Sequence, residues 1–310
     1  MTAQSTAEAE APDPGTKVNP RLPRAEAPIP PTLATSVKRW ARRVGIWLPL
    51  AALAVWTVFP LLMTLSVSFK SRSDVSADPG LIPSNPTFDG YLSVFERQGF
   101  QSAFLNSLIV GFGTVVLTLV IAVPAAYAFA RFAFKGRHLL LLFTLLPRLI
   151  PGLGLMVPLY RIAVALGAID ELLTLIVAFT GTVLPLAVWL LVGFFQQVPR
   201  DLEEAASVDG ASMFVRIRYI VLPLALPAMI TIGVLAFREA WNEFNLVLGL
   251  TSSPGSRTLP YELFLMTQTT GFQDNPGQAA FAILTIIPFI FVYLRIERYV
   301  VSGITSGSVK

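Results

Sequence analysis

Few side chains in this sequence could bind a polar ligand or perform acid–base chemistry, and the clearest candidates lie within long apolar stretches. Arg148 interrupts the apolar stretch 139–160, and its guanidinium could donate hydrogen bonds to hydroxyl groups or to a phosphate. Glu239 and Glu243 lie four residues apart near the end of another apolar stretch, so a helix presents both on one face. These carboxylates could contact a ligand or form polar pairs between helices.

Two further residues of that second stretch could contribute to a ligand site. Asn242 is polar, and Trp241 could stack on a sugar ring or anchor a helix at a membrane interface. A charge at membrane depth costs about 3 kcal/mol, and such residues usually face a bundle interior or a water-filled cavity. Arg148 could therefore face a polar path through the interior and hydrogen-bond a ligand there. Alternatively, it could form a structural ion pair with Glu239 or Glu243, or extend its side chain to the membrane interface.

The sequence excludes several kinds of reactive site. It has no cysteine, which excludes disulfides, thiolate catalysis and cysteine-ligated metals. The single histidine, His138, cannot form a histidine-based metal site, so we expect no metal. Gly152 and Gly154 lack the Lys-Ser/Thr of a nucleotide-binding loop, and no Walker motif occurs elsewhere. We therefore expect no catalytic residues and no enzymatic activity. The alternative is an intramembrane enzyme, which would need nucleophiles, histidines or carboxylate pairs inside the spans, and the sequence offers little of this kind.

These candidate residues lie in stretches that are long and apolar enough to be membrane spans. Apolar residues make up 54% of the 310-residue chain, and only 14% are charged, against roughly 25% in soluble proteins. A helix needs about 20 apolar residues to cross the hydrocarbon core. The apolar stretches predict an all-α polytopic membrane protein with six transmembrane helices, at about 44–66, 102–130, 139–160 (broken by prolines), 172–195, 219–248 and 279–296.

The distribution of basic residues predicts the topology. Residues 1–36 are rich in proline and alanine without an apolar period, which predicts a disordered tail, and the membrane domain follows over 37–310. With the N-terminus inside, the inner segments hold 13 Lys and Arg and the outer segments hold 5. Because excess positive charge marks the cytoplasmic side, we expect a multi-pass protein with both termini in the cytoplasm.

A polar loop at 199–223 separates the fourth and fifth predicted spans on the cytoplasmic side. Pro199 and Asp201 favour a helix start, Gly210 favours a helix end, and Ser212 can cap a second helix. The loop is therefore expected to form a short helix, a tight turn and a longer helix that enters the fifth span. It could dock on a partner or lie solvated at the interface without one.

The spacing in this loop resembles the EAA loop of permease subunits in ATP-binding-cassette importers: Glu204-Ala205-Ala206, then Gly210, then Ile220-Val-Leu-Pro223. In that family the loop forms a coupling helix, which sits in a groove of a cytoplasmic ATPase subunit. The resemblance implies the type I importer permease fold and a set of ATPase-coupling residues: Glu203, Glu204, Ala205, Ala206, Asp209 and Gly210.

Three further segments are similar to the carbohydrate-importer permeases related to the maltose permease MalG: 240–244 (Ala-Trp-Asn-Glu-Phe), 257–260 (Arg-Thr-Leu-Pro) and the tail 299–310. The resemblance covers roughly residues 41–310, and the charged pair Arg238-Glu239 departs from the family pattern. It implies a tail that reaches the ATPase subunits through Ser306, Gly307, Val309 and Lys310. The candidates for a translocation path are the polar and aromatic residues described above: Arg148, Glu239, Trp241, Asn242 and Glu243. For the residues of the fifth span the resemblance favours a structural or gating role, because in MalG-type systems the partner permease holds most of the sugar.

The resemblance also implies a set of partners and an activity. The partners are a homologous, MalF-like second permease, two ATPase subunits that bind ATP-Mg, an extracytoplasmic solute-binding protein or lipoprotein, and the lipid of a bacterial inner membrane. The chain itself is expected to bind no cofactor and no nucleic acid. The implied activity is import of a disaccharide or oligosaccharide by alternating access. Import of a polyol or glycerol phosphodiester is the alternative, and an ion-coupled secondary transporter is the remote one.

Overall fold

The computed structural model describes residues 33–270 and 275–306, and the side chains of residues 44–269 and 275–295. The chain divides into two units, residues 1–58 and 59–310, which are described separately. Helix α1 (Leu33–Ser68) begins in the first unit, so residues 33–36 of the stretch predicted as a tail are helical. The rest of the predicted tail lies outside the described residues. The side chains of residues 44–58 are all exposed and mostly apolar, as lipid contact requires.

Every regular element in the described part of the chain is helical. After α1 these elements are α2 (Asp74–Ala77), α3 (Asp89–Glu96), α4 (Phe100–Arg131), α5 (Arg137–Thr144), the 3-10 turn η1 (Leu146–Leu149), α6 (Gly152–Ala165), α7 (Leu172–Gln197), α8 (Arg200–Val208), α9 (Met213–Arg216), the π-helical turn η2 (Ile217–Val221), α10 (Leu222–Asn242), α11 (Asn245–Leu250), the 3-10 turn η3 (Pro254–Ser256), α12 (Leu259–Thr270) and α13 (Asn275–Ser306).

Helices long and apolar enough to cross a membrane lie at each of the predicted spans. Five such segments are found in the described residues, at Val44–Ser68, Phe100–Arg131, Leu172–Gln197, Met213–Asn242 and Asn275–Arg295. A sixth span is a bent pair, in which residues 137–149 and 152–165 meet at 95°. The chain is thus an all-helical polytopic membrane protein.

The bend in the third span follows from its prolines. Pro147 lies at the start of η1, and Pro151 adopts an extended conformation (φ −55°, ψ 140°) immediately before α6. Proline lacks the amide hydrogen that a continuous helix needs and disfavours helical geometry in the residue before it. The predicted interruption is therefore a sharp change of direction, and it places Arg148 at the corner.

The fifth span differs from the predicted range 219–248. Its apolar segment starts earlier, at Met213, and passes through the π-helical turn into α10. It also ends earlier, because Glu243 is extended (φ −73°, ψ 124°) and breaks the helix after Asn242. The Glu243 Oε1 atom accepts a hydrogen bond of 3.0 Å from the amide of Leu246, which satisfies a free donor at the start of α11.

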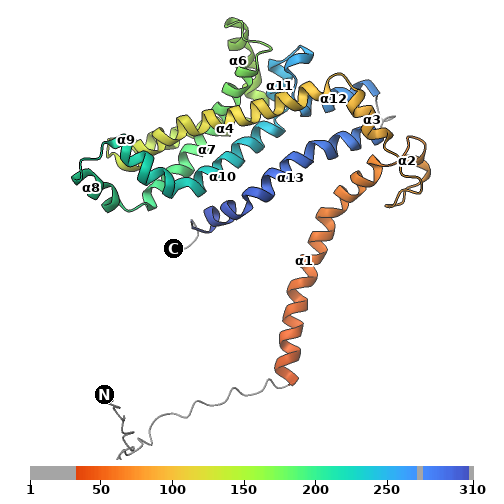
Figure 1. The fold of residues 1–310 in the computed structure, drawn as a ribbon, viewed down its shortest axis with the longest axis horizontal. Helices are drawn as coiled ribbons and strands as arrows, with labels where there is room; N and C mark the ends of the chain where they lie inside the picture. Colours follow the sequence, from red (N-terminus) through yellow and green to blue (C-terminus); the bar gives the residue numbers. More distant parts are fainter. Residues whose placement is uncertain (1–32, 271–274, 307–310) are drawn as a thin grey trace, which may run out of the picture. The chain divides into compact units, whose positions relative to one another are not determined.

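The core of the second unit is a bundle in which α4 packs along α7 and α10, side by side in Figure 1. Small residues line the contact: Ala122, Ala126 and Ala130 of α4, Ala187 of α7, and Ala225 and Ala228 of α10 are all buried. Small side chains let helix backbones approach closely, which is how helices associate where lipid removes the hydrophobic driving force. Helix α13 packs against α10 and α3.

Candidate functional site

The polar loop after α7 folds as the predicted helix, turn and helix. Helix α8 follows Pro199 and carries acidic residues in its first turn, which favour the helix dipole. Gly210 has φ +82°, a conformation that glycine adopts without strain, and the Ala211 amide donates to the Ala206 carbonyl at 2.9 Å. Ser212 then caps α9 by accepting a 3.4 Å hydrogen bond from the Val215 amide.

The predicted coupling residues lie on different faces of α8. Glu204, Ala205 and Asp209 are exposed, and Ala206 is half-buried. Val208, at the C-terminal end of the same helix, has 88% of its surface exposed. A short helix thus presents small, acidic and apolar side chains together on its outer surface.

Glu203 points the other way, into the chain. It is 6% exposed, and its Oε2 accepts a 2.6 Å hydrogen bond from the Tyr127 hydroxyl of α4. Arg131 Nη2 lies 2.7 Å from Glu203 Oε1, a close ion pair rather than an aligned hydrogen bond. Removing one partner of a buried ion pair typically costs about 3–5 kcal/mol. Sequence reasoning grouped Glu203 with the predicted ATPase-coupling residues and missed Tyr127 and Arg131. The spacing of four between Tyr127 and Arg131, which places both on one helix face, was the available signal.

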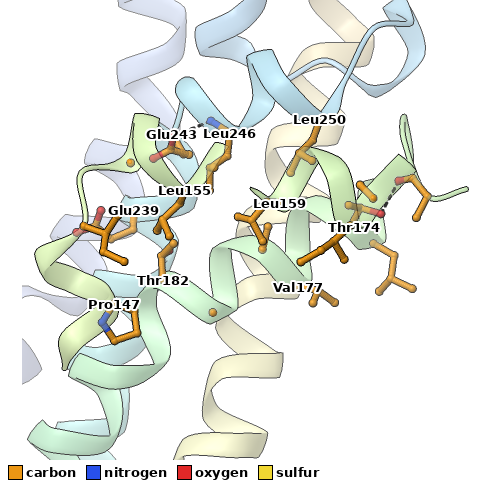
Figure 2. A pocket seen from close by; sticks show the side chains of 18 of the residues that line it. Pro147, Leu155, Leu159, Thr174, Val177, Thr182, Glu239, Glu243, Leu246 and Leu250 are labelled. Carbon is orange, nitrogen blue, oxygen red and sulfur yellow. Dashed lines mark hydrogen bonds between the residues drawn. The ribbon is translucent and has the colours of Figure 1, made fainter. Parts of the chain in front are cut away.

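A second candidate site is a cavity of about 680 Å³ beside the bent span. Its walls come from η1, α6, α7, the end of α10 and α11, and Figure 2 shows Leu155, Leu159, Val177, Leu246 and Leu250 among its apolar side chains. The polar residues Glu239, Glu243 and Thr182 lie together on the left side of Figure 2. A mostly apolar cavity with a few polar groups is the usual form of a small-molecule site.

Arg148 connects the walls of this cavity. Its Nη2 lies 3.5 Å from Glu239 Oε1, and its Nη1 donates to the Thr182 carbonyl at 3.4 Å. Arg238 Nη1 lies 3.6 Å from the same Glu239 oxygen. Both Arg148 and Glu239 keep about a third or more of their side-chain surface exposed, at 32% and 40%. The pair therefore joins the bent span to α10 while remaining open to the cavity.

The other two predicted path residues do not line the cavity. Trp241 is 3% exposed and stacks on Phe237 at 5.2 Å between ring centroids, with Phe104 edge-on at 6.4 Å. Asn242 is exposed, and its Nδ2 donates to the Arg238 carbonyl of its own helix at 2.8 Å. The structure thus brings together three of the five residues, namely Arg148, Glu239 and Glu243.

A third cluster joins the α6–α7 turn to the segment after α11. Asp170 accepts four hydrogen bonds: from the amide and hydroxyl of Ser252, both at 2.6 Å, from the Ser253 amide at 2.8 Å and from the Ser256 hydroxyl at 2.7 Å. Burial raises the pKa of the Asp170 carboxyl, but these hydrogen bonds outweigh burial and hold that pKa well below its usual range.

The remaining predicted groups can be placed only in part. Ser306 is the last residue of α13, while Gly307, Val309 and Lys310 lie outside the described residues. Among the described residues no group of three or more His, Asp or Glu side chains could hold a metal ion. The described residues therefore form a multi-pass helical membrane protein with an exposed short helix, α8, and a cavity beside the bent span.

Residues 119–306 match the family described as binding-protein-dependent transport system inner membrane component, and the chain belongs to this family. It is 39% identical over 272 residues to the trehalose transport system permease protein SugB of Mycobacterium tuberculosis (strain CDC 1551 / Oshkosh), covering 87% of this chain and 99% of SugB. It is 34% identical over 260 residues to the diacetylchitobiose uptake system permease protein DasC of Streptomyces coelicolor, covering 83% of this chain and 94% of DasC.

A solved structure has the same fold. One chain of a bacterial ABC transporter involved in the import of the acidic polysaccharide alginate matches with a TM-score of 0.72 and 22% identity, covering 86% of this chain and 98% of that one. The expectation from the sequence that this chain is a permease of an ABC importer is confirmed. The chain is an inner-membrane component of a binding-protein-dependent ABC transport system, and it is a permease rather than an enzyme.

Proposed function

We propose that this chain is the translocation subunit of an ATP-driven importer for a carbohydrate, and that helix α8 is the part on which an ATPase subunit acts. The observation that carries this proposal is the exposed helix–turn–helix α8–α9. Its outer surface offers the Glu204 carboxylate beside the small side chain of Ala205, which allows close approach of a partner. A carboxylate there would form a charge-assisted contact with a basic residue of the ATPase.

The proposed assembly contains a second, homologous permease, two ATPase subunits that bind ATP-Mg, and an extracytoplasmic solute-binding protein. The family itself is defined by its dependence on such a binding protein. The excess of Lys and Arg in the inner segments favours cytoplasmic termini and a cytoplasmic α8, where ATP is available. The C-terminal residues Ser306, Gly307, Val309 and Lys310 would contact the ATPase subunits.

We propose that the cavity beside the bent span forms this chain's part of the path along which the solute crosses the membrane. Arg148 and Glu239 hold each other loosely and remain accessible, so solute hydroxyls could replace that contact at low cost. Alternating access would then expose these groups first to one side of the membrane and then to the other. The substrate class is supported by the relatives, which include permeases named for trehalose and diacetylchitobiose. We favour a disaccharide or short oligosaccharide, with a polyol or glycerol phosphodiester as the alternative.

The proposal is tested by reconstituting the complete complex in liposomes and measuring uptake of candidate solutes with their binding protein. Candidate disaccharides, oligosaccharides, polyols and glycerol phosphodiesters are first screened by thermal shift of that binding protein. We expect uptake of a carbohydrate only when ATP and Mg²⁺ are present on the ATPase side. Uptake driven by an ion gradient without ATP would contradict the proposal and favour a secondary transporter.

A further inference from the structure

Helix α8 is connected to the membrane helices in two different ways. One connection is covalent and runs through α9 and the π-helical turn Ile217–Val221 into α10. The other is made by side chains, which join α8 and its preceding turn to the end of α4. The proposed function assigns no role to this second connection.

The side-chain connection has several points of attachment within a short distance. Tyr127 Oη and Arg131 Nη2 contact the two oxygens of Glu203 at 2.6 and 2.7 Å. Arg131 Nη2 also donates to the Val198 carbonyl at 3.0 Å, and Arg200 Nη2 donates to the Ala130 carbonyl at 3.5 Å. Both ends of α8's first turn are therefore fixed to the last turn of α4.

The connection is also buried, which makes it strong. Tyr127 is 4% exposed, and the side chains of Arg131 and Glu203 are 9% and 7% exposed. Charged groups interact more strongly away from water and are screened less by salt. Water also cannot easily replace either Arg131 or Glu203 as the other's partner. The Tyr127 ring packs edge-on against Phe195 of α7 at 6.3 Å, so the attachment point belongs to the α4–α7–α10 bundle.

We infer that Tyr127, Arg131 and Glu203 form a positioning joint, which transmits displacement of α8 to α4 and through α4 to the packed bundle. This inference rests on the proposed function, because it assumes that an ATPase displaces α8. The joint makes α8 and α4 move together. Without it, only the covalent connection through the π-helical turn would carry the displacement, and α8 could tilt without moving α4.

The Glu203–Arg131 pair could transmit displacement or could only stabilise the fold. The ratio of solute imported to ATP hydrolysed distinguishes these two roles. Loss of structural stability lowers the amount of active complex, so uptake and hydrolysis fall in proportion and their ratio stays constant. Loss of the joint leaves hydrolysis running while uptake falls, so the ratio falls. This readout does not depend on how much protein is recovered.

The experiment compares three variants in the reconstituted complex with its binding protein. Glu203→Gln removes the charge, and Tyr127→Phe removes only the hydroxyl donor while keeping the packed ring. Glu262→Gln is the matched control, because Glu262 is also 5% exposed in its side chain and paired with an arginine, Arg97, at 3.0 Å, but it lies in α12. We expect a fall on the order of tenfold in solute imported per ATP for the first two variants, a typical size for coupling between sites, and an unchanged ratio for the control.

An unchanged ratio in Tyr127→Phe and Glu203→Gln would overturn the joint and leave the proposed function intact. Should Glu203→Gln fail to assemble, Tyr127→Phe decides alone, because it preserves the ring and both charges. An equal fall in Glu262→Gln would also overturn the joint, since any buried ion pair would then have the same effect. Absence of ATP-driven uptake in the unmodified complex would overturn the proposed function, and the joint with it.

Discussion

Glu203 and Glu204 are neighbours in helix α8, yet Glu203 is 6% exposed and held by Tyr127 and Arg131, while Glu204 is exposed. Successive residues of a helix point about 100° apart, so two adjacent carboxylates can face different surroundings. One faces the membrane bundle and the other faces outward. This arrangement suits a helix that is fixed to its own chain on one side and receives a partner on the other.

Replacing Glu204 by alanine should uncouple the ATPase without disturbing the fold. Its side chain is exposed, so the variant should insert and assemble with the second permease as the unmodified chain does. We expect stimulation of ATP hydrolysis by the binding protein to be largely lost, because the charge-assisted contact with the ATPase is removed. The control is Glu96→Ala, which removes an exposed carboxylate from α3. Normal stimulation in Glu204→Ala would show that α8 is not the coupling helix.

The turn after α8 should tolerate only residues that accept its backbone conformation. Gly210 has φ +82°, and a Cβ added there would meet no atom within 4 Å, so any effect must come from the backbone rather than from a clash. A left-handed conformation costs a β-branched residue about 1–2 kcal/mol, whereas asparagine adopts it more readily. We expect Gly210→Val to lower coupled transport and Gly210→Asn to retain most of it. Equal transport by the two variants would contradict this account of the turn.

Arg148 should affect solute handling if the cavity belongs to the path. A hydrogen bond to a charged group contributes about 1.5–3 kcal/mol, so Arg148→Ala should raise the KM for uptake on the order of tenfold or more. Arg161→Ala provides the matched control, because Arg161 is exposed on the same bent span but does not line the cavity. An Arg148→Ala complex that assembles and transports with an unchanged KM would show that the ion pair with Glu239 is structural only.

The Asp170 cluster should make stability depend on pH in the acid range. The folded-state pKa of Asp170 lies below its ordinary value of about 3.9, so its contribution is present above that value and is lost as pH falls through the folded pKa. At neutral pH, Asp170→Asn should lower the free energy of unfolding by about 1–3 kcal/mol, and this difference should shrink as pH falls. Asparagine tolerates the φ of +68° found at this position, so only the carboxylate is lost.

The measurement for Asp170 is the thermal unfolding of the detergent-solubilised protein between neutral and acid pH. The control is Asp89→Asn, which removes an exposed carboxylate from the first turn of α3. A difference between Asp170→Asn and the unmodified protein that stayed constant across this pH range would contradict the assignment of these hydrogen bonds to an ionised carboxylate.

The sequence predicted the helices well, because long apolar stretches leave few alternatives in a membrane and because prolines mark where a span breaks. It also predicted the turn at Gly210, where the chemistry is local. It could not predict which way side chains point once helices pack. Trp241 is two residues from both Glu239 and Glu243 and therefore lies on another face of α10, among Phe237 and Phe104.

The sequence did not predict where α10 ends or which way Glu203 points, because both depend on side-chain contacts made only in the folded protein. Glu243 breaks the helix because its side chain satisfies the start of α11, which no apolar pattern records. Glu203 faces inward because Tyr127 and Arg131, in a helix far earlier in the chain, provide a donor and a charge there.

The central claim is that an ATPase subunit sits on the exposed face of α8, and site-specific crosslinking tests it most directly. The chain has no cysteine, so a single cysteine at exposed Ala205 provides a unique reactive group. A single cysteine at exposed Ala77 provides the control, because Ala77 lies in the segment 67–101, which the charge distribution places on the outer side. In the assembled complex, a short thiol-to-amine crosslinker should join Ala205→Cys to the ATPase subunit and should not join Ala77→Cys to it. The account would be contradicted if Ala205→Cys gave no crosslink to the ATPase in a complex that transports with normal activity.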